Sequence, residues 1–259
     1  YKVEYAQRKM AEIFRQYEFH SLLHLGRVRT STFTSMAERF RANVYWTQNL
    51  ISLAQKRGIK NLIVLSTFHV YGAMQINHAY ITEDEPLRAA QGFPDLADAV
   101  EMDHAATTTL WKERGMRTVV LRPANIIGKN IRNNVCQMLR SGVIPKILGF
   151  DPLMQFIHEE DVAQALILAL NGQKSGIFNV AGEGVIPWSK AIEVVGATAV
   201  PVPEVAAYTL LRLMQAMVPT IPTHLIDYYK FPTTISDEPF RREFPYAPSH
   251  TTMGALKSI

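Results

Sequence analysis

The sequence has one cysteine, no long apolar run and no block of basic residues, and each of these absences excludes a class of protein. Cys136 has no second cysteine to pair with, which excludes the internal disulfide framework of small secreted proteins. No run of about 18 uncharged apolar residues is present, so no segment of this sequence is expected to span a bilayer. The sequence begins with no charged-then-apolar signal peptide, and we therefore expect a cytoplasmic protein.

The charges are nearly balanced and scattered along the chain. The 27 Lys and Arg residues against 23 Asp and Glu residues give a net charge of +4. Because the basic residues form no cluster, we interpret them as solvated surface and expect no nucleic-acid partner. A chain of 259 residues that is 47% hydrophobic is typical of a globular protein with one large α/β domain or two small ones.

Short apolar runs alternate with helical spacing along the first half of the chain. Three runs are apolar almost throughout, as strands buried on both faces are: 21–25, 62–65 and 118–121. Helices are expected around them, over 6–17, 35–57 and 96–114. Gly58 and Gly115 follow the last two helices, where glycine commonly ends a helix. This alternation predicts a doubly wound parallel α/β sheet.

The regular alternation of predicted strands and helices ends after Pro123. We expect helices over 131–140, 161–170, 187–195 and 204–217, and one further strand at 176–180. The tail from Pro219 onward is rich in proline and aromatic residues and is expected to lie against the sheet. The predicted division is a Rossmann-like core, residues 1–128 and 156–182, and a small capping region for substrate, residues 129–155 and 183–259.

Six strings occur in the order and spacing typical of one known family: 23–26, 43–50, 66–72, 83–86, 121–128 and 156–163. In this respect the sequence resembles the extended short-chain dehydrogenase/reductases, also called the NAD-dependent epimerase/dehydratase family. The resemblance implies a Rossmann-like fold, NAD or NADP as cofactor, and hydride transfer at a carbinol or carbonyl carbon of a small-molecule substrate. It also implies a homodimer, paired through the helices expected at 35–57 and 96–114.

The resemblance places the cofactor at the carboxyl ends of the strands, where ligands bind in open parallel sheets. It puts Leu25, Gly26 and Arg27 along the adenosine and pyrophosphate half of the dinucleotide. The nicotinamide half is expected against Ser66, Thr67, Pro123 and Asn125. Gly, Ser and Asn are also common wherever a chain turns, so each residue taken singly has a plainer explanation. No metal site is expected.

Individual roles follow from the same resemblance. Thr67 matches the catalytic Ser or Thr whose hydroxyl bonds the reacting substrate oxygen, and Asn125 is expected to help position the substrate. Asn43 is expected to be structural, tying its helix to a neighbouring strand. We expect Asp161 to cap its helix and His158 to be a packed, hydrogen-bonded histidine.

The sequence departs from the family at its central chemistry. Members carry a Tyr-x-x-x-Lys pair, in which the tyrosine acts as general acid and base. Counting from the neighbouring strings puts that tyrosine near Asp95 and the lysine near Ala99, and no tyrosine occurs between Tyr80 and Tyr208. The usual pair is therefore absent from its expected place.

Another group could take over the proton chemistry. The candidates are Asp95, Asp98, Glu101, His69 and His104. The four candidates at the predicted helix can also be explained without a catalytic role. Asp95 and Asp98 can simply begin the helix, and Glu101 and His104 can lie on its solvent face. His69 is favoured because it follows Thr67 by two residues, and histidine titrates near neutral pH. Tyr71 is interpreted as a packing residue of the strand-end string.

A second departure concerns the substrate. Family members that use sugar nucleotides carry an arginine for the diphosphate shortly before the string at 156–163, where this chain has Met154 followed by Gln155. Methionine cannot pair with phosphate, although Lys129, Arg132 and Lys146 could supply charge. A more apolar substrate is one reading of the apolar stripe formed by Leu210, Leu211, Leu213, Met214 and Met217, but we favour the reading that this stripe is core packed against the tail.

A third absence is the phosphate-binding string Gly-x-x-Gly-x-x-Gly, which precedes all these strings in the family. Residues 2–5 resemble the third strand of the family sheet, so we expect the first βαβ unit to lie upstream in a longer protein. Three functions remain open. The chain is either an atypical NAD(P)-dependent oxidoreductase or epimerase/dehydratase, or a catalytically inactive member that acts as a cofactor-binding or regulatory module. The third and least favoured is a structural subunit that pairs through the helices expected at 35–57 and 96–114.

Overall fold

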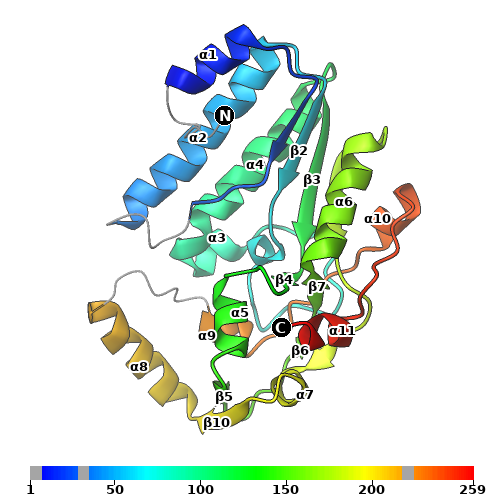
Figure 1. Cartoon of the computed structure of the whole chain (residues 1–259). Coiled ribbons are helices and arrows are strands. Elements are labelled where there is room, and N and C mark those ends of the chain that lie inside the picture. Colours follow the sequence, from blue (N-terminus) through cyan, green and yellow to red (C-terminus); the bar gives the residue numbers. More distant parts are fainter. Residues whose placement is uncertain (1–7, 29–34, 218–224) are drawn as a thin grey trace.

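The computed structural model describes residues 8–28, 35–217 and 225–259, so the strand predicted at 2–5 lies outside the described residues. Its centre is a four-stranded parallel sheet in the order β1-β2-β3-β8 (Figure 1). The strands are β1 (Ser21–His24), β2 (Asn61–Leu65), β3 (Arg117–Pro123) and β8 (Gly176–Val180). The parallel strands predicted from the apolar runs are confirmed.

Helices cover both faces of this sheet (Figure 1). On one face lie α2 (Met36–Lys56) and α4 (Ala97–Lys112), which pack against each other, together with α1 (Arg8–Gln16). On the other face lie α6 (Glu159–Asn171) and α10 (Glu238–Glu243). The predicted doubly wound α/β architecture is confirmed.

Neighbouring residues of one strand serve the two faces. Leu62 and Val64 of β2 belong to the core beneath α2, whereas Ile63, between them, belongs to the core beneath α6. Because all three are fully or almost fully buried, each contributes about 1.5–3 kcal/mol of hydrophobic stabilisation. This two-sided burial is the physical reason that the strands read as continuous apolar runs.

The ends of α2 follow from local chemistry. The hydroxyl of Ser35 accepts a hydrogen bond from the backbone N–H of Glu38 at 3.2 Å, which satisfies one of the free donors of the first turn. After Lys56 the chain leaves the helix through Gly58, whose φ of +68° lies in the left-handed region that favours glycine. The predicted boundaries of this helix are therefore correct within one residue.

Beyond β3, short paired strands build the other end of the molecule. Strand β4 (Asn125–Ile127) pairs in parallel with β7 (Phe156–His158), and β5 (Val143–Ile147) pairs in parallel with β10 (Thr198–Val202). A two-residue antiparallel pair, β6 (Leu153–Met154) with β9 (Ile186–Pro187), completes them. The β5–β10 and β6–β9 pairs join segments 129–155 and 183–259.

The remaining helices are short, apart from one. They are η2 (Phe68–Tyr71), α3 (Ala89–Gly92), η3 (Pro94–Leu96), α5 (Asn134–Leu139), α7 (Trp188–Val194), α8 (Glu204–Met217), α9 (Leu225–Tyr228) and α11 (Thr252–Lys257). No helix among the described residues is both long and apolar enough to cross a membrane.

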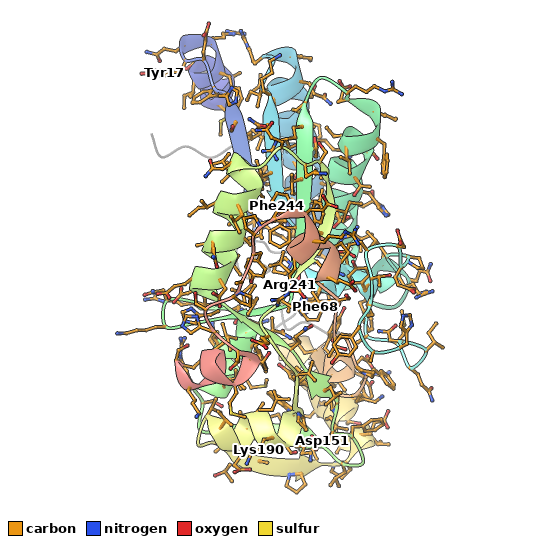
Figure 2. The ribbon with its side chains drawn as sticks, turned by 90° about the vertical axis from the view of Figure 1, so that its right-hand side faces the viewer. Tyr17, Phe68, Asp151, Lys190, Arg241 and Phe244 are labelled. Atoms are coloured by element: carbon orange, nitrogen blue, oxygen red, sulfur yellow. The ribbon has the colours of Figure 1, made fainter. Side chains whose placement is uncertain are left out.

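The C-terminal tail packs against the sheet, as predicted. The rings of Phe240 and Phe244 lie 5.7 Å and 5.3 Å from that of Phe178 on β8, measured between centroids. Figure 2 shows Phe244 and Arg241 near the middle of the molecule, with Tyr17 at one end and Asp151 and Lys190 at the other. The aromatic tail therefore completes the core on the α6 face.

Two predictions about helices are wrong. Leu210 and Leu213 of α8 are 56% and 63% exposed, so the apolar stripe is not core at these positions. The helix is instead held by polar contacts, in which the hydroxyl of Tyr208 donates to Asp227 at 2.7 Å. At α6 the cap is His158, whose Nδ1 accepts from the N–H of Glu160, rather than Asp161.

Candidate functional site

The carboxyl ends of β1, β2 and β3 lie level at one edge of the sheet. In the strand register, His24 is opposite Val64 and Leu65 is opposite Leu121. The backbone N–H of Ser66 extends the ladder by donating to the carbonyl of Leu121 at 2.7 Å. The predicted residues at or directly after these strand ends therefore share this edge: Leu25, Gly26, Ser66, Thr67 and Pro123.

Thr67 and His69 form a hydrogen-bonded pair at the end of β2. Thr67 precedes the short helix η2 and caps it, because its hydroxyl accepts from the backbone N–H of His69 at 3.3 Å. The same oxygen lies 2.8 Å from Nδ1 of the His69 ring. Both side chains are half-buried. A hydroxyl and an imidazole at this distance can exchange a proton, which is the chemistry a general acid or base needs.

Tyr228 of α9 holds His69 from the other side. Its hydroxyl donates to the backbone carbonyl of His69 at 2.6 Å, and the two rings lie 4.7 Å apart between centroids. Burial raises the pKa of Tyr228 well above its ordinary value, and the negative charge of Asp95 raises it further. Sequence reasoning missed this residue, because 159 positions separate it from His69 and no motif marks it.

Asp98 occupies the centre of a buried polar network where the Tyr-x-x-x-Lys pair was expected. Its carboxylate accepts from Nε of Arg27 at 3.1 Å and from the amide of Asn43 at 2.7 Å, and it lies 3.3 Å from Nε of Arg39. The two guanidiniums also donate to the backbone carbonyl of Asp95, at 2.9 Å and 2.7 Å. Asp98 is fully buried and pairs with two arginines, so it does more than begin the helix.

Asn43 ties α2 to the chain that follows β1. Its side-chain oxygen accepts from the N–H of Val28 at 2.8 Å, and its amide nitrogen donates to the carbonyl of Val28 at 3.1 Å. This two-way pairing with backbone gives the asparagine the structural role that the sequence suggested.

Glu101 and His104, which the sequence offers as acid or base groups on α4, lie away from this network. Their side chains are about half-exposed, and the Glu101 carboxylate lies 3.9 Å from Nδ1 of His104. The pair therefore belongs to the solvent face of the helix, as the plainer reading of the sequence held.

The hydroxyl of Ser66 is directed into the core rather than along the open edge. It donates to Asp103, a buried carboxylate that also receives two hydrogen bonds from the guanidinium of Arg122, at 2.9 Å and 2.7 Å. Arg122 continues the network to the hydroxyl of Tyr71 at 3.0 Å. Burial raises the pKa of Tyr71 to about 12, so this tyrosine stays neutral near physiological pH and serves as a core residue.

Asn125 is buried within the β4–β7 pair. Its amide donates to the backbone carbonyl of Gln155 at 3.3 Å. The side chain of Gln155 in turn pairs in both directions with the backbone of Ile235, and Met154 is buried beside it. The positions at which sugar-nucleotide members were expected to carry an arginine therefore hold a core residue and a structural amide.

Comparisons with known proteins agree with this architecture. The sequence profile described as the NAD dependent epimerase/dehydratase family matches residues 4–181. An uncharacterised protein of Mycobacterium tuberculosis is 26% identical over 252 residues, which are 95% of this chain and 66% of that protein. The human short-chain dehydrogenase/reductase family 42E member 1 is 29% identical over 140 residues, 49% of this chain and 35% of that protein.

Solved structures share the fold at low sequence identity. The dTDP-glucose 4,6-dehydratase from Bacillus anthracis, determined in complex with NAD, superposes with a TM-score of 0.74. It is 16% identical, and the match covers 99% of this chain and 76% of the dehydratase.

The fold, the order of the strand-end strings and the match over residues 4–181 place the chain in the NAD-dependent epimerase/dehydratase family of extended short-chain dehydrogenases/reductases. The chain spans about two thirds of the length of the mycobacterial relative.

Proposed function

We propose that this protein binds NAD or NADP and oxidises or reduces a carbinol or carbonyl carbon of a small molecule, with Thr67 and His69 handling the proton. The observation that carries the proposal is the 2.8 Å contact between the Thr67 hydroxyl and Nδ1 of His69 at the carboxyl end of β2. This pair occupies the edge at which ligands bind in open parallel sheets.

The residues at this edge are suited to a dinucleotide. Among the described residues, no heavy atom lies within 4 Å of the position a Cβ on Gly26 would take, at the end of β1 where the adenosine and pyrophosphate half is expected. Leu25 is exposed there, and the Thr67 hydroxyl and Pro123 lie at the ends of the next two strands. Arg27 is committed to Asp98 by the hydrogen bonds described above, which leaves its predicted contact with the pyrophosphate as an expectation.

The proposed chemistry divides between cofactor and protein. A bound NAD or NADP would supply the hydride acceptor for oxidation of the carbinol carbon. Thr67 hydrogen-bonds the carbinol oxygen and takes its proton, while Nδ1 of His69 takes the proton of the threonine hydroxyl. The proton therefore ends on the imidazole as the carbonyl forms, and the reverse transfer serves reduction. Tyr228 fixes the His69 backbone through its hydroxyl and limits the movement of the ring.

The proposal replaces the Tyr-x-x-x-Lys pair rather than restoring it. Asp95 and Ala99 stand where that pair was expected, and neither can act as a tyrosinate beside an ammonium group. Tyr228 is a poor substitute as a base, because its pKa lies well above the ordinary value and its hydroxyl is engaged with a carbonyl. The imidazole of His69, in contact with the Thr67 hydroxyl, can accept or give a proton without such a lysine.

Cofactor binding is the first test. NADH and NADPH are titrated into the natural full-length protein, and enhancement of their fluorescence is followed. We expect saturable binding of one of the two, together with reduction of NAD or NADP by a member of a panel of alcohols. Failure of both cofactors to bind would overturn the proposal.

A second function has its own support. The Asp98 network fills the region of the expected catalytic pair with buried ion pairs, which suits a member that retains the fold and acts as a cofactor-binding or regulatory module. Such a protein would bind NADH or NADPH and turn over no alcohol or carbonyl compound. The same titration followed by the substrate panel therefore separates the two functions.

A further inference from the structure

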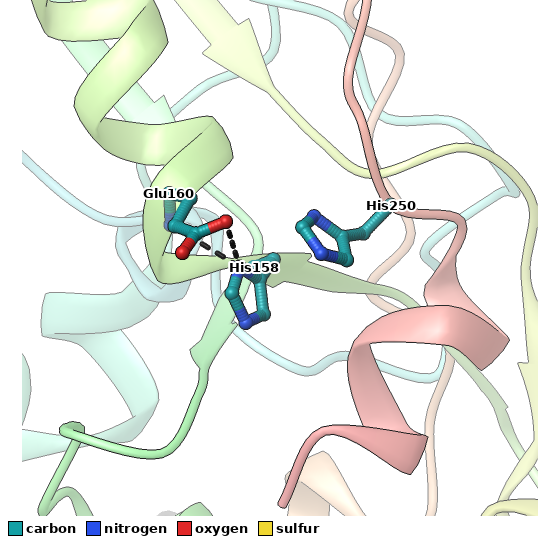
Figure 3. A group of neighbouring side chains, drawn as sticks. All are labelled: His158, Glu160 and His250. Atoms are coloured by element: carbon teal, nitrogen blue, oxygen red, sulfur yellow. Dashed lines mark hydrogen bonds and ion pairs between the residues drawn. The ribbon is translucent and has the colours of Figure 1, made fainter.

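Two histidines from distant parts of the chain, neither of them part of the Thr67–His69 pair, meet at the start of α6. His158 ends β7 and caps α6, whereas His250 belongs to the segment before α11 (Figure 3). Their rings are stacked, with centroids 3.9 Å apart and 30° between the planes. Glu160, in the first turn of α6, lies beside them, and its carboxylate is 3.8 Å from Nδ1 of His158.

We propose that His158, Glu160 and His250 form a three-ligand site for a divalent transition-metal ion of the Zn²⁺ class. One potential ligand atom from each side chain lies within 4.8 Å of the other two. Two imidazoles and one carboxylate are a donor set that Zn²⁺ uses in proteins. Glu160 is 75% exposed, so its side chain is free to close the remaining distance.

The hydrogen bonds indicate which nitrogens carry lone pairs. Nδ1 of His250 lies 3.2 Å from a carboxylate oxygen of Asp161, which can only accept, so this nitrogen carries the proton. Nε2 of His250 is therefore the unprotonated nitrogen in the neutral ring. A histidine whose second nitrogen donates to a carboxylate is the arrangement that orients metal ligands in known sites.

His158 also has a lone pair at the cluster. Its Nδ1 accepts a long hydrogen bond from the backbone N–H of Glu160, at 3.3 Å. A metal at this nitrogen would displace that weak bond. Since His158 is buried at the end of β7, the more exposed ring of His250 would have to turn out of the stack to bring Nε2 to the same ion. The cost is therefore one poor capping interaction and the contact between the two rings.

The local charge favours a cation. Glu159, Glu160 and Asp161 are consecutive acidic residues in the first turn of α6. In the described part of the chain, the basic side chains beside Glu160 and Asp161 are His158 and His250, which carry no charge when each ring keeps a free lone pair. A bound dication would offset this excess of negative charge, which outweighs the positive partial charge of the helix N-terminus.

A metal ion at this site would link the segment that contains His250 to the core. Asp161 already accepts from the backbone N–H groups of Ser249 and His250, at 2.7 Å and 3.2 Å. A coordinate bond from His250 would add a strong cross-link between this segment and β7. Three protein ligands leave a fourth tetrahedral position, which water would fill from the solvent side.

The test is uptake of Zn²⁺ by the tag-free, metal-stripped protein in equilibrium dialysis, with thermal unfolding followed in parallel. We expect one ion per chain and a higher Tm with Zn²⁺, because ligand binding to the folded state stabilises it. His250→Gln and Glu160→Gln should each weaken binding about tenfold or more and remove the rise in Tm. Glu160→Gln changes an exposed side chain and is expected to leave the fold intact.

The matched control is His104→Gln, which alters an exposed histidine with its own glutamate neighbour, Glu101, on α4. It should bind Zn²⁺ as the unchanged protein does. The proposal is overturned if the protein takes up no Zn²⁺ at micromolar concentration, or if uptake is the same in the two site variants as in the control. Neither result bears on the binding of NADH or NADPH, so the two proposals can fail separately.

Discussion

The hydroxyl of Thr67 lies 2.8 Å from Nδ1 of His69, and the two residues are joined by a capping hydrogen bond within the same turn. This contact fixes the ring at the carboxyl end of β2, at the edge where the cofactor is proposed to bind. Because the two side chains are only two residues apart, their geometry depends on a single turn of backbone rather than on distant packing.

Substitution of this pair should lower turnover far more than it weakens cofactor binding. Thr67→Val and His69→Gln each remove one partner of the proton transfer, which costs about 100-fold or more in rate where general acid–base catalysis operates. The measurement is reduction of NAD or NADP with the alcohol that the unchanged protein oxidises. His104→Gln, at an exposed position on α4, serves as the control. Undiminished turnover by both site variants would exclude the proposed mechanism.

The buried pair of Asp103 and Arg122 should be essential for stability. Asp103→Asn leaves the guanidinium of Arg122 buried without its counter-charge, and we expect a loss of about 3–5 kcal/mol in the free energy of unfolding. Urea denaturation measures this loss. The double variant Asp103→Leu with Arg122→Met removes both charges and should be less destabilised. An Asp103→Asn protein within about 1 kcal/mol of the unchanged one would contradict this expectation.

His24 should make stability depend on pH below neutrality. The ring is buried on β1 beside the hydroxyl of Thr47, at 2.8 Å, and burial lowers its pKa to about 4. Between pH values of about 6.5, the pKa of histidine in the unfolded chain, and about 4, His24 is protonated in the unfolded chain and neutral in the folded one. The free energy of unfolding therefore falls as the pH falls through this range. The free energy of unfolding is expected to decrease by about 3 kcal/mol across this pH range.

Urea denaturation at several pH values between about 7 and 4 tests this dependence. His24→Gln cannot take up the proton and should show a flatter profile than the unchanged protein. His20→Gln, at an exposed position just before β1, should keep the same steep dependence of stability on pH as the unchanged protein. Identical profiles for His24→Gln and the unchanged protein would mean that other groups dominate acid unfolding.

The homodimer inferred from the family resemblance should pair through α2 and α4. These helices pack side by side, and each exposes a large aromatic ring, Tyr45 at 59% and Trp111 at 75%. We expect the double variant Tyr45→Glu with Trp111→Glu to halve the mass seen by light scattering. Leu213→Glu places the same charge on the exposed face of α8 and should leave the mass unchanged. The opposite pattern would move the interface to α8.

Most of the fold could be predicted because it rests on local patterns. The runs around Leu62 and Val119 are apolar at almost every residue, as a strand covered on both faces requires. Ser35 and Gly58 mark the ends of α2 with a local hydrogen bond and a left-handed turn. The location of the candidate site could also be predicted, because the carboxyl ends of neighbouring parallel strands lie at the same edge of a sheet. The exposed leucines of α8 were misjudged because a helical stripe shows that a face is apolar and leaves open what covers it.

The sequence by itself determined the doubly wound sheet, the place of Thr67 and His69 at a strand end, and the lack of a tyrosine near residue 95. Only the tertiary structure decided what surrounds them. Tyr228 reaches His69 from 159 residues away, Asp98 becomes the partner of two arginines, and His250 stacks on His158. Such contacts depend on how the C-terminal region folds back across the core. That path is set by the summed packing of many side chains, and no local spacing in the sequence encodes it.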